Sequence, residues 1–157
     1  MKLCDFGSSK RIDKKGQNTP YIVSRYYRAP ELILCISKYT EAIDIWAVGC
    51  IIAEIITRDP LFQGKSEGDQ LFKIFEVLGS PTEKEFKVLG KIVPYDKKLF
   101  KEFKKYPRRK LEGKFRYIHD LENLIDLLDR IFKYIPGERI TATEAMMHPF
   151  FEEIRAQ

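Results

Sequence analysis

Residues 41–57 are apolar on every side of a predicted helix, and Asp44 and Glu54 carry the only charges after the first position. A helix that is apolar all round belongs in the interior of a protein. Thr40 is suited to cap this helix, and Pro60 lies just beyond its end. The pattern therefore predicts a central, buried helix over residues 41–57.

Other segments show the pattern of amphipathic helices. Apolar residues recur at one-face helical spacing over residues 71–78, before Gly79, and over residues 121–132, before Pro136. A Ser or Thr followed three residues later by an acidic residue, the signature of a capping box, occurs in three places. The pairs are Ser66 with Asp69, Thr82 with Glu85, and Thr141 with Glu144. We predict a helix at each of these positions and a further helix over residues 121–132.

Two segments lack any helical or alternating pattern. Residues 8–20 are polar and interrupted by Gly and Pro, which indicates a mobile loop. Between residues 91 and 118, basic and aromatic residues alternate irregularly, as in an insert that lies over a surface. We find no internal repeat and no convincing sheet, so the predicted fold class is mainly α. The predicted divisions are residues 1–31, 40–90, 91–118 and 119–157.

Composition narrows the class of protein. At 157 residues the chain has the size of one domain. Lys and Arg outnumber Asp and Glu by 28 to 23, which favours acidic partners and fits both phosphate-bearing ligands and nucleic acid. Cys4, Cys35 and Cys50 have no disulfide or metal spacing and are predicted to be packing residues in a reducing compartment. Since no signal or membrane-spanning pattern occurs, a cytoplasmic or nuclear location is expected.

A set of short motifs occurs in one order along the chain, and this order carries more weight than any one motif. The motifs are Cys4-Asp5-Phe6-Gly7, Arg28-Ala29-Pro30-Glu31, Asp44-Ile45-Trp46-Ala47-Val48-Gly49-Cys50, and Arg139. The set resembles the activation segment and helical C-terminal lobe of a eukaryotic serine/threonine protein kinase. Residues 24–32, 69–71 and 77–82 are similar to the group that holds cyclin-dependent and mitogen-activated kinases. The resemblance is greatest to the glycogen synthase kinase-3 (shaggy) family and covers nearly the whole chain.

The resemblance implies a parent enzyme that uses ATP and Mg²⁺. Asp5 would hold the magnesium ion, Phe6 would pack inward to set the state of the loop, and Gly7 would permit the sharp turn. The alternative for Asp5 is an ordinary turn aspartate. One carboxylate does not hold magnesium tightly without substrate phosphates and a second ligand.

Residues of the activation segment would contact phosphate. By resemblance, Lys10 helps to hold a phosphate already present on the substrate, and Arg25 and Arg28 belong to the loop that contacts the residue after the acceptor. Their charges suit charge-assisted hydrogen bonds to phosphate, whereas the alternative is that all three are solvated surface cations. Tyr21 corresponds to the tyrosine that this family phosphorylates in its own activation loop, and Thr19 is a competing acceptor.

Two structural roles are also implied. Glu31 and Arg139 would form a buried ion pair that fixes the end of the activation segment to the helical core. Asp44, on a helix without a polar face, needs hydrogen-bond donors, which in kinases are backbone amides of the catalytic loop. That loop does not occur in this sequence, so Asp44 is expected to lack partners.

The basic and aromatic residues 97–116 fit a nucleic-acid surface through phosphate contacts and stacking. No recognition motif accompanies them, so we do not expect nucleic acid as a partner. Docking of Phe100, Phe103 and Tyr106 onto the core explains the aromatic residues more simply.

In the resembled family, this insert and the helix over residues 67–78 form a groove for an amphipathic helix of a scaffold protein. Phe72 and Tyr95 would line it. His119 and His148 have no carboxylate or cysteine at ligand or triad spacing and are not expected to be catalytic. His148 is expected to fix the packing of the terminal helix.

A kinase also needs a glycine-rich loop, a strand lysine paired with a helix glutamate, and a His-Arg-Asp catalytic loop, and none of these occurs here. The catalytic base is therefore expected upstream, and the isolated chain is not expected to be catalytic. Two hypotheses stay open: the C-terminal part of a kinase that transfers the ATP γ-phosphate to protein Ser or Thr, and a non-catalytic docking or scaffold-binding helical module. Residues 41–57 are expected to expose apolar surface in this chain.

Overall fold

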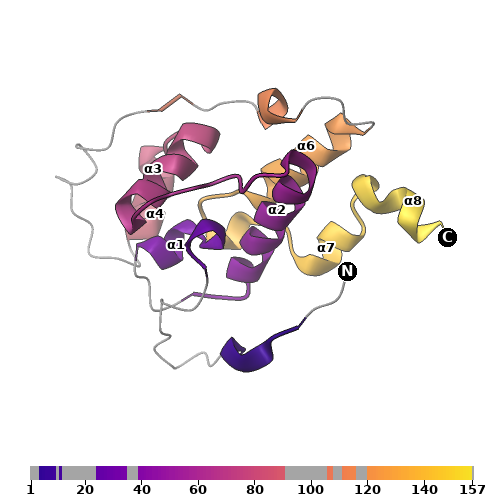
Figure 1. The fold of residues 1–157 in the computed structure, drawn as a ribbon, viewed down its shortest axis with the longest axis horizontal. Helices are drawn as coiled ribbons and strands as arrows, with labels where there is room; N and C mark the ends of the chain where they lie inside the picture. The colour runs from indigo at the N-terminus through magenta and orange to yellow at the C-terminus, as the bar shows by residue number, and fades with distance from the viewer. Residues whose placement is uncertain are drawn as a thin grey trace.

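The structure is an assembly of short helices. The computed structural model describes residues 4–9, 11, 24–34, 39–90, 106–107, 111–115 and 120–156. Its α-helices are α1 (Pro30–Ile33), α2 (Ala42–Thr57), α3 (Glu67–Leu78), α4 (Glu83–Gly90), α6 (Leu121–Ile131), α7 (Ala142–Met146) and α8 (Glu152–Arg155) (Figure 1). Short 3₁₀ turns cover Phe6–Ser8, Arg25–Tyr27, Leu111–Lys114, Pro136–Glu138 and Pro149–Phe151. No strand occurs in the ranges described, which confirms the mainly α fold class.

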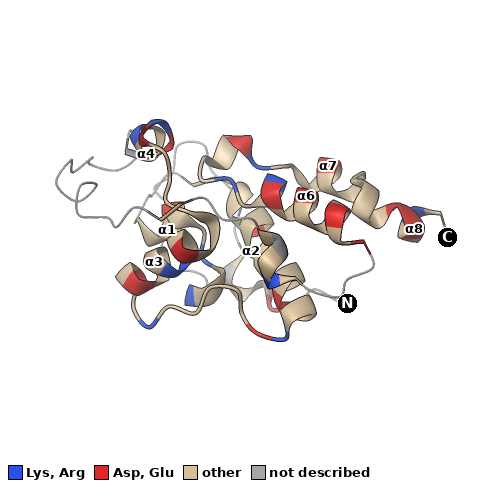
Figure 2. Ribbon diagram, turned by 90° about the horizontal axis from the view of Figure 1, so that it is seen from above, with Lys and Arg blue, Asp and Glu red and all other residues tan. Residues whose placement is uncertain are grey.

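Helix α2 lies at the centre of the molecule. In Figures 1 and 2 it runs between the group formed by α1 and α3 and the group formed by α6 and α7. Trp46, Cys50 and Ala53 are buried on one face of this helix. The helix ends at Thr57, and the next residue, Arg58, adopts left-handed backbone with φ 67°. None of the helices described has the length and apolar character needed to cross a lipid bilayer.

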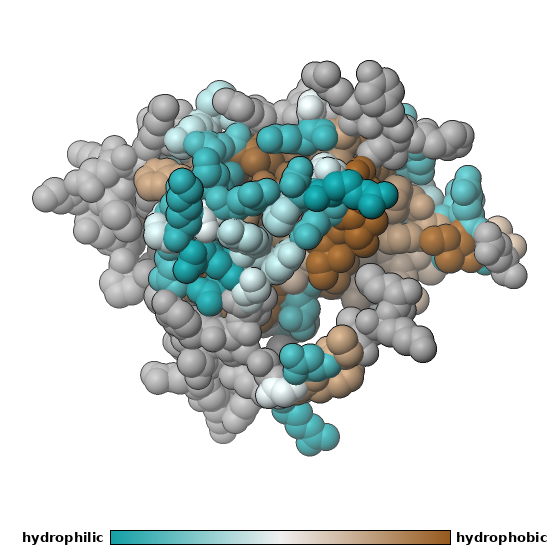
Figure 3. Space-filling model, in the orientation of Figure 1, coloured by the Kyte–Doolittle hydropathy of each residue, from teal (hydrophilic) through white to brown (hydrophobic). Residues whose placement is uncertain are grey.

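The opposite face of α2 is apolar and exposed. Val48, Ile51 and Ile55 have exposed fractions of 46%, 40% and 61%, and Figure 3 shows hydrophobic surface in this region. The prediction of a helix buried on all sides is therefore wrong for this face, because no segment in the described part of the chain covers it. The expectation that residues 41–57 expose apolar surface is confirmed.

Aromatic rings from three distant parts of the chain meet in the core. Trp46 stacks on Phe62 with ring centroids 5.8 Å apart, and its ring centroid lies 4.9 Å from that of Phe132 in an edge arrangement. Helix α6 adds the apolar stripe predicted over residues 121–132. Its buried side chains are Leu124, Ile125, Leu127, Leu128 and Ile131. Burial of this stripe against α2 explains why α6 is stable as a helix of three turns.

Gly49 allows α2 and α6 to approach closely. A β-carbon at this position would lie 2.5 Å from Cγ2 of Ile131 and 3.0 Å from Cε1 of Phe132. We expect Gly49→Ala to lower the free energy of unfolding by about 1–3 kcal/mol, because the side chains of α6 must move within a filled core. Urea unfolding followed by circular dichroism measures the difference.

Gly68, in the first turn of α3, provides the matched control. A β-carbon there meets no atom within 4 Å. Gly68→Ala is therefore expected to be neutral or to stabilise the protein by up to about 1 kcal/mol, since it removes the backbone entropy of a helical glycine. A Gly49→Ala variant that unfolds at the same urea concentration as the unsubstituted chain would contradict the close packing of α2 on α6.

Two of the three predicted capping boxes are reciprocal. In each, the Thr hydroxyl accepts from the Glu amide and the Glu carboxylate accepts from the Thr amide. The pairs are Thr82 with Glu85 and Thr141 with Glu144. At the start of α3, Ser66 Oγ accepts from the Asp69 amide at 3.2 Å, but the Asp69 carboxylate accepts from the Lys65 amide. The third prediction is thus correct for the cap and wrong for the return bond.

The cysteines and the aromatic residues of the insert were predicted to pack in the core. The structure confirms this for some of them and contradicts it for Cys4. Cys50 is buried, and burial raises the pKa of its thiol. Cys4 is exposed, so its packing prediction is wrong, and Cys35 lies outside the described residues. From the insert, Leu111 and Phe115 are buried in the core. Tyr106 packs against the core as predicted, whereas Phe100 and Phe103 lie outside the described residues.

His148 joins the C-terminal segment to α6, in agreement with its predicted packing role. It is 3% exposed, and its Nδ1 accepts from the Phe150 amide at 3.3 Å. The ring proton therefore resides on Nε2, which lies 2.9 Å from Oδ2 of Asp126. The pKa of Asp126 is lowered by its hydrogen bond from Arg130 and, next, by that from His148.

We expect Asp126→Asn to weaken this connection in a pH-dependent way. Because the folded state lowers the pKa of Asp126, the stabilising contribution is present above the ordinary carboxyl pKa of about 4 and is lost as pH falls through the folded value. Urea unfolding across this pH range should show a destabilisation by Asp126→Asn that is present at neutral pH and vanishes in acid. Asp129→Asn, which removes a carboxylate from an exposed position on the same helix, is the matched control. A pH-independent difference would contradict the assignment.

Candidate functional site

Asp5 begins a tight turn and presents an exposed carboxylate. Its backbone is left-handed, with φ 58°, and its Oδ1 accepts a hydrogen bond from the Gly7 amide at 3.3 Å. Aspartate is one of the few residues that adopt this conformation readily. One carboxylate oxygen is thus engaged by the turn, and the exposed group retains capacity for a cation.

Phe6 does not pack inward. It is 68% exposed and does not belong to the hydrophobic core or to the side chains that pack against it. The expectation that Phe6 is buried is therefore wrong for this structure. The physical reason is that the described part of the chain places no apolar side chains over the Phe6–Ser8 turn.

Arg25 and Arg28 both contact the start of α3 or the turn before it, although Arg25 is exposed and only Arg28 is buried. Arg25 donates to the Lys65 carbonyl at 2.8 Å. The guanidinium of Arg28 lies 3.1 Å from the Glu67 carboxylate, and its side chain is only 11% exposed. A phosphate at Arg28 would have to compete with Glu67. In this structure both arginines instead stabilise the position of residues 24–28.

Tyr27 was not singled out from the sequence, yet it connects the same segment to α2. Its hydroxyl donates to Oε2 of Glu54 at 2.8 Å. This hydrogen bond is the main cause that raises the pKa of Tyr27, followed by burial. No spacing rule links residues 27 positions apart, so only the tertiary structure reveals the contact.

Glu31 and Arg139 form a two-point ion pair in the interior. The distances are 2.6 Å from Nη1 to Oε1 and 2.7 Å from Nη2 to Oε2, and the two side chains are 1% and 0% exposed. Arg139 also donates from Nε to the Lys133 carbonyl and from Nη1 to the Ala42 carbonyl. Every part of the buried guanidinium plane thus has a partner, as a buried charge requires.

Asp44 lies on the exposed side of α2. The pattern had predicted a buried position, and this prediction is wrong. In the described part of the structure, no hydrogen bond reaches its side chain. The pKa of Asp44 is raised, first by partial desolvation along the helix and then by the Glu41 carboxylate. An exposed carboxylate can be solvated by water, so the absence of protein donors at this position carries no large penalty.

Of the remaining residues singled out from the sequence, the structure describes Phe72 and leaves the others undescribed. Lys10, Tyr21, Tyr95 and His119 lie outside the described residues. Phe72, on α3, is half-buried, and its ring centroid lies 6.5 Å from that of Phe75 in an edge arrangement.

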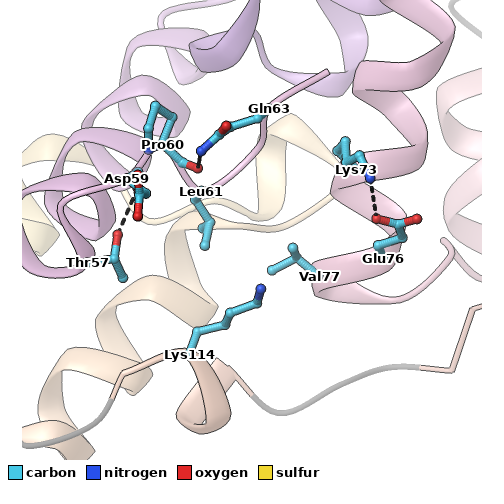
Figure 4. Close-up of a pocket in the computed structure, with 9 residues that line it drawn as sticks. All are labelled: Thr57, Asp59, Pro60, Leu61, Gln63, Lys73, Glu76, Val77 and Lys114. Atoms are coloured by element: carbon cyan, nitrogen blue, oxygen red, sulfur yellow. Dashed lines mark hydrogen bonds and ion pairs between the residues drawn. The ribbon is translucent and has the colours of Figure 1, made fainter. Parts of the chain in front are cut away.

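A surface pocket of about 640 Å³ lies between the turn after α2, helix α3 and Lys114 (Figure 4). It holds none of the site residues predicted from the sequence. The ion pair between Lys73 and Glu76, with 2.9 Å between Nζ and Oε2, lies along one wall. Neither in this pocket nor in the rest of the described ranges is a group of three or more His, Cys, Asp or Glu side chains arranged to hold a metal ion.

Comparison with known proteins decides the family. Residues 1–151 match the protein kinase domain. The chain belongs to the protein kinase domain family. It is 43% identical over 155 residues to glycogen synthase kinase 1 of Pyricularia oryzae and 44% identical over 155 residues to protein kinase gsk3 of Schizosaccharomyces pombe. Each alignment covers 99% of this chain and 38% of the relative, so this kinase chain spans 38% of the length of these curated relatives.

The relatives confirm the resemblance to glycogen synthase kinases that the motifs indicated. Their similarity extends over 155 residues, which include the motifs at Asp5 and Glu31 and the helical core described above. The buried pair of Glu31 and Arg139 gives this kinase segment a fixed end at α1, while Asp5 and the Phe6–Ser8 turn stand at its other end.

Proposed function

We propose that this chain forms part of a serine/threonine protein kinase that transfers the γ-phosphate of ATP to protein substrates. The observation that carries the proposal is the match of residues 1–151 to the protein kinase domain, with relatives named as glycogen synthase kinases. In phosphoryl transfer the protein mainly positions the reactants and neutralises charge. The residues of this chain fit the positioning part of that work.

Asp5 is the proposed magnesium ligand of this chain. Its exposed carboxylate and its hydrogen bond to the Gly7 amide suit a hard cation that takes few protein ligands. Substrate phosphates and water would complete the ligand set, and magnesium would neutralise phosphate charge when bound. Phe6 and Gly7 are proposed to border the nucleotide at the same turn.

Residues 24–28 are the proposed contact for the acceptor peptide. Arg25 and Arg28 hold this segment through α3 and its preceding turn, and Lys10 is proposed to meet a phosphate on the substrate. Tyr21 is the proposed modification site of the activation segment. A cytoplasmic or nuclear location is proposed with this function.

A transfer assay tests the function directly. The full-length protein that carries this sequence is incubated with γ-labelled ATP, Mg²⁺ and a peptide that contains Ser and Thr. We expect acid-stable label on Ser or Thr, which disappears when magnesium is chelated or when the acceptor positions are replaced by Ala. Absence of label on every Ser and Thr peptide of a substrate library would overturn the proposal.

A second candidate is a non-catalytic module that binds an amphipathic helix of a scaffold protein. The half-buried Phe72 on α3 favours it, with Tyr95 as the proposed second lining residue. The two candidates differ in one measurement. The full-length protein would bind amphipathic helical peptides and lose this binding with Phe72→Asp, yet it would transfer no phosphate.

A further inference from the structure

Gln70 is a fully buried glutamine whose amide connects three separate backbone groups. Its exposed fraction is 0%. Its Oε1 accepts from the Gly64 amide at 2.7 Å, and its Nε2 donates to the Phe62 carbonyl at 3.1 Å and to the Tyr26 carbonyl at 3.4 Å. A buried amide with partners for both its oxygen and its nitrogen imposes a specific geometry on all of them.

The turn of residues 62–66, between α2 and α3, is held directly against Gln70. A β-carbon on Gly64 would lie 2.3 Å from the Cα and 2.4 Å from the amide nitrogen of Gln70. Only glycine permits such a close approach of two backbones. The side chain of Gln70 and the absence of a side chain at Gly64 therefore define one compact unit.

This unit contacts the proposed acceptor-binding segment at several points. Besides the bond from Gln70 to Tyr26, Arg25 donates to the carbonyl of Lys65 in the same turn. Arg28 is paired with Glu67 at the first position of α3. Within residues 24–28, the backbone hydrogen bonds from Tyr27 to Ser24 and from Arg28 to Arg25 are only local. The position of the segment relative to the core therefore depends on these longer-range contacts together with the hydrogen bond from Tyr27 to Glu54 on α2.

We propose that Gln70 is a positioning residue that sets the shape of residues 24–28 and thereby the affinity for the acceptor peptide. The inference rests on the proposed kinase function and deepens it. Gln70 acts through the backbone of the segment and has no contact with the reacting groups. Its effect should therefore fall on the peptide and not on the nucleotide.

The first test measures the segment itself by hydrogen exchange. Gln70→Met preserves the size of the side chain but leaves Gly64, Phe62 and Tyr26 without their amide partner. Exchange at residues 24–28 and 62–66 should become faster by about tenfold or more, while α6 keeps its protection. Gln63→Met is the matched control, because Gln63 is an exposed glutamine of the same turn whose side chain, among the described residues, donates to the Pro60 carbonyl alone.

The second test separates the two substrates in steady-state kinetics of the full-length protein. We expect Gln70→Met to raise the KM for the acceptor peptide by roughly tenfold, with the KM for ATP within about twofold of the unsubstituted enzyme. Gln70→Glu should raise the KM for the peptide at least as much as Gln70→Met, since it retains the acceptor for Gly64 but places a buried carboxylate oxygen against the carbonyl oxygens of Phe62 and Tyr26. Gln63→Met should leave both constants unchanged.

The outcomes are distinguishable. If the unsubstituted protein labels no Ser or Thr peptide, the proposed function fails, and this inference fails with it. If the enzyme is active and Gln70→Met leaves hydrogen exchange at residues 24–28 unchanged, or leaves the peptide KM unchanged, only the positioning role fails. A loss of kcat with both KM values unchanged would indicate fewer folded molecules and would likewise contradict positioning.

Discussion

Arg139→Met is expected to lower the free energy of unfolding by about 3–5 kcal/mol, because it leaves the Glu31 carboxylate buried and unpaired. Glu31 is 1% exposed, and both of its oxygens are bound by Arg139. The same change also removes the donors to the carbonyls of Lys133 and Ala42. One substitution therefore leaves several buried polar groups without partners, and the desolvation cost of each lowers the free energy of unfolding.

Trp46 makes this prediction measurable at the site. It is the single tryptophan of the chain, and the guanidinium carbon of Arg139 lies 5.0 Å from its ring centroid. Urea unfolding followed by Trp46 fluorescence should show a lower midpoint and a shifted emission in the folded state. Arg130→Met is the control, because Arg130 is more than half exposed in its pair with Asp126 and should contribute no more than about 1 kcal/mol.

Removal of both charges separates the ion pair from simple loss of packing. Glu31→Leu combined with Arg139→Met leaves no buried unpaired charge, so the double variant should be more stable than Arg139→Met alone. A double variant with the summed loss of the two single variants would show that the two side chains do not interact. An Arg139→Met variant as stable as Arg130→Met would contradict the burial of the pair.

If the full-length protein transfers phosphate as proposed, Asp5→Asn is expected to reduce that transfer by at least about a hundredfold, since it removes the negative charge proposed to hold magnesium. Asparagine tolerates the left-handed backbone of this position and can accept the hydrogen bond from the Gly7 amide. The turn should therefore persist, and the loss should lie in chemistry and not in folding.

The measurement compares the transfer rate with the urea midpoint of each variant. Asp5 is exposed, so Asp5→Asn should unfold at the same urea concentration as the unsubstituted protein. Asp59→Asn is the control, because Asp59 is an exposed acid remote from the Phe6–Ser8 turn in sequence, and it should retain full activity. Normal transfer by Asp5→Asn would show that this carboxylate is not a required ligand.

The helices could be predicted from the sequence because their signals are local. The stripe of α6 and the caps at Thr82 and Thr141 depend on residues within one or two turns of each other. The end of α3 at Gly79, with φ 87°, was predictable for the same reason. The exposed face of α2 could not be read from periodicity, because exposure depends on which other segments cover a helix.

The candidate site was predictable only in part. Resemblance to kinases paired Glu31 with Arg139, whose positions are 108 residues apart, and the structure places them in contact. The contacts of Arg25 with backbone carbonyls and of Arg28 with Glu67 were not predicted from the sequence, and the contact of these arginines with phosphate stays a prediction. A charged residue on a surface loop has many compatible partners, and its sequence neighbours do not select one.

The amino-acid sequence by itself determined the helical class, the main helix boundaries and the kinase resemblance, because periodicity, caps and ordered motifs are properties of the chain. Only the tertiary structure decided which face of α2 is covered, that Phe6 is exposed, and that Gln70 joins residues 24–28 to the turn before α3. Burial and long-range hydrogen bonds arise when distant segments meet, and their energies depend on that meeting rather than on residue type.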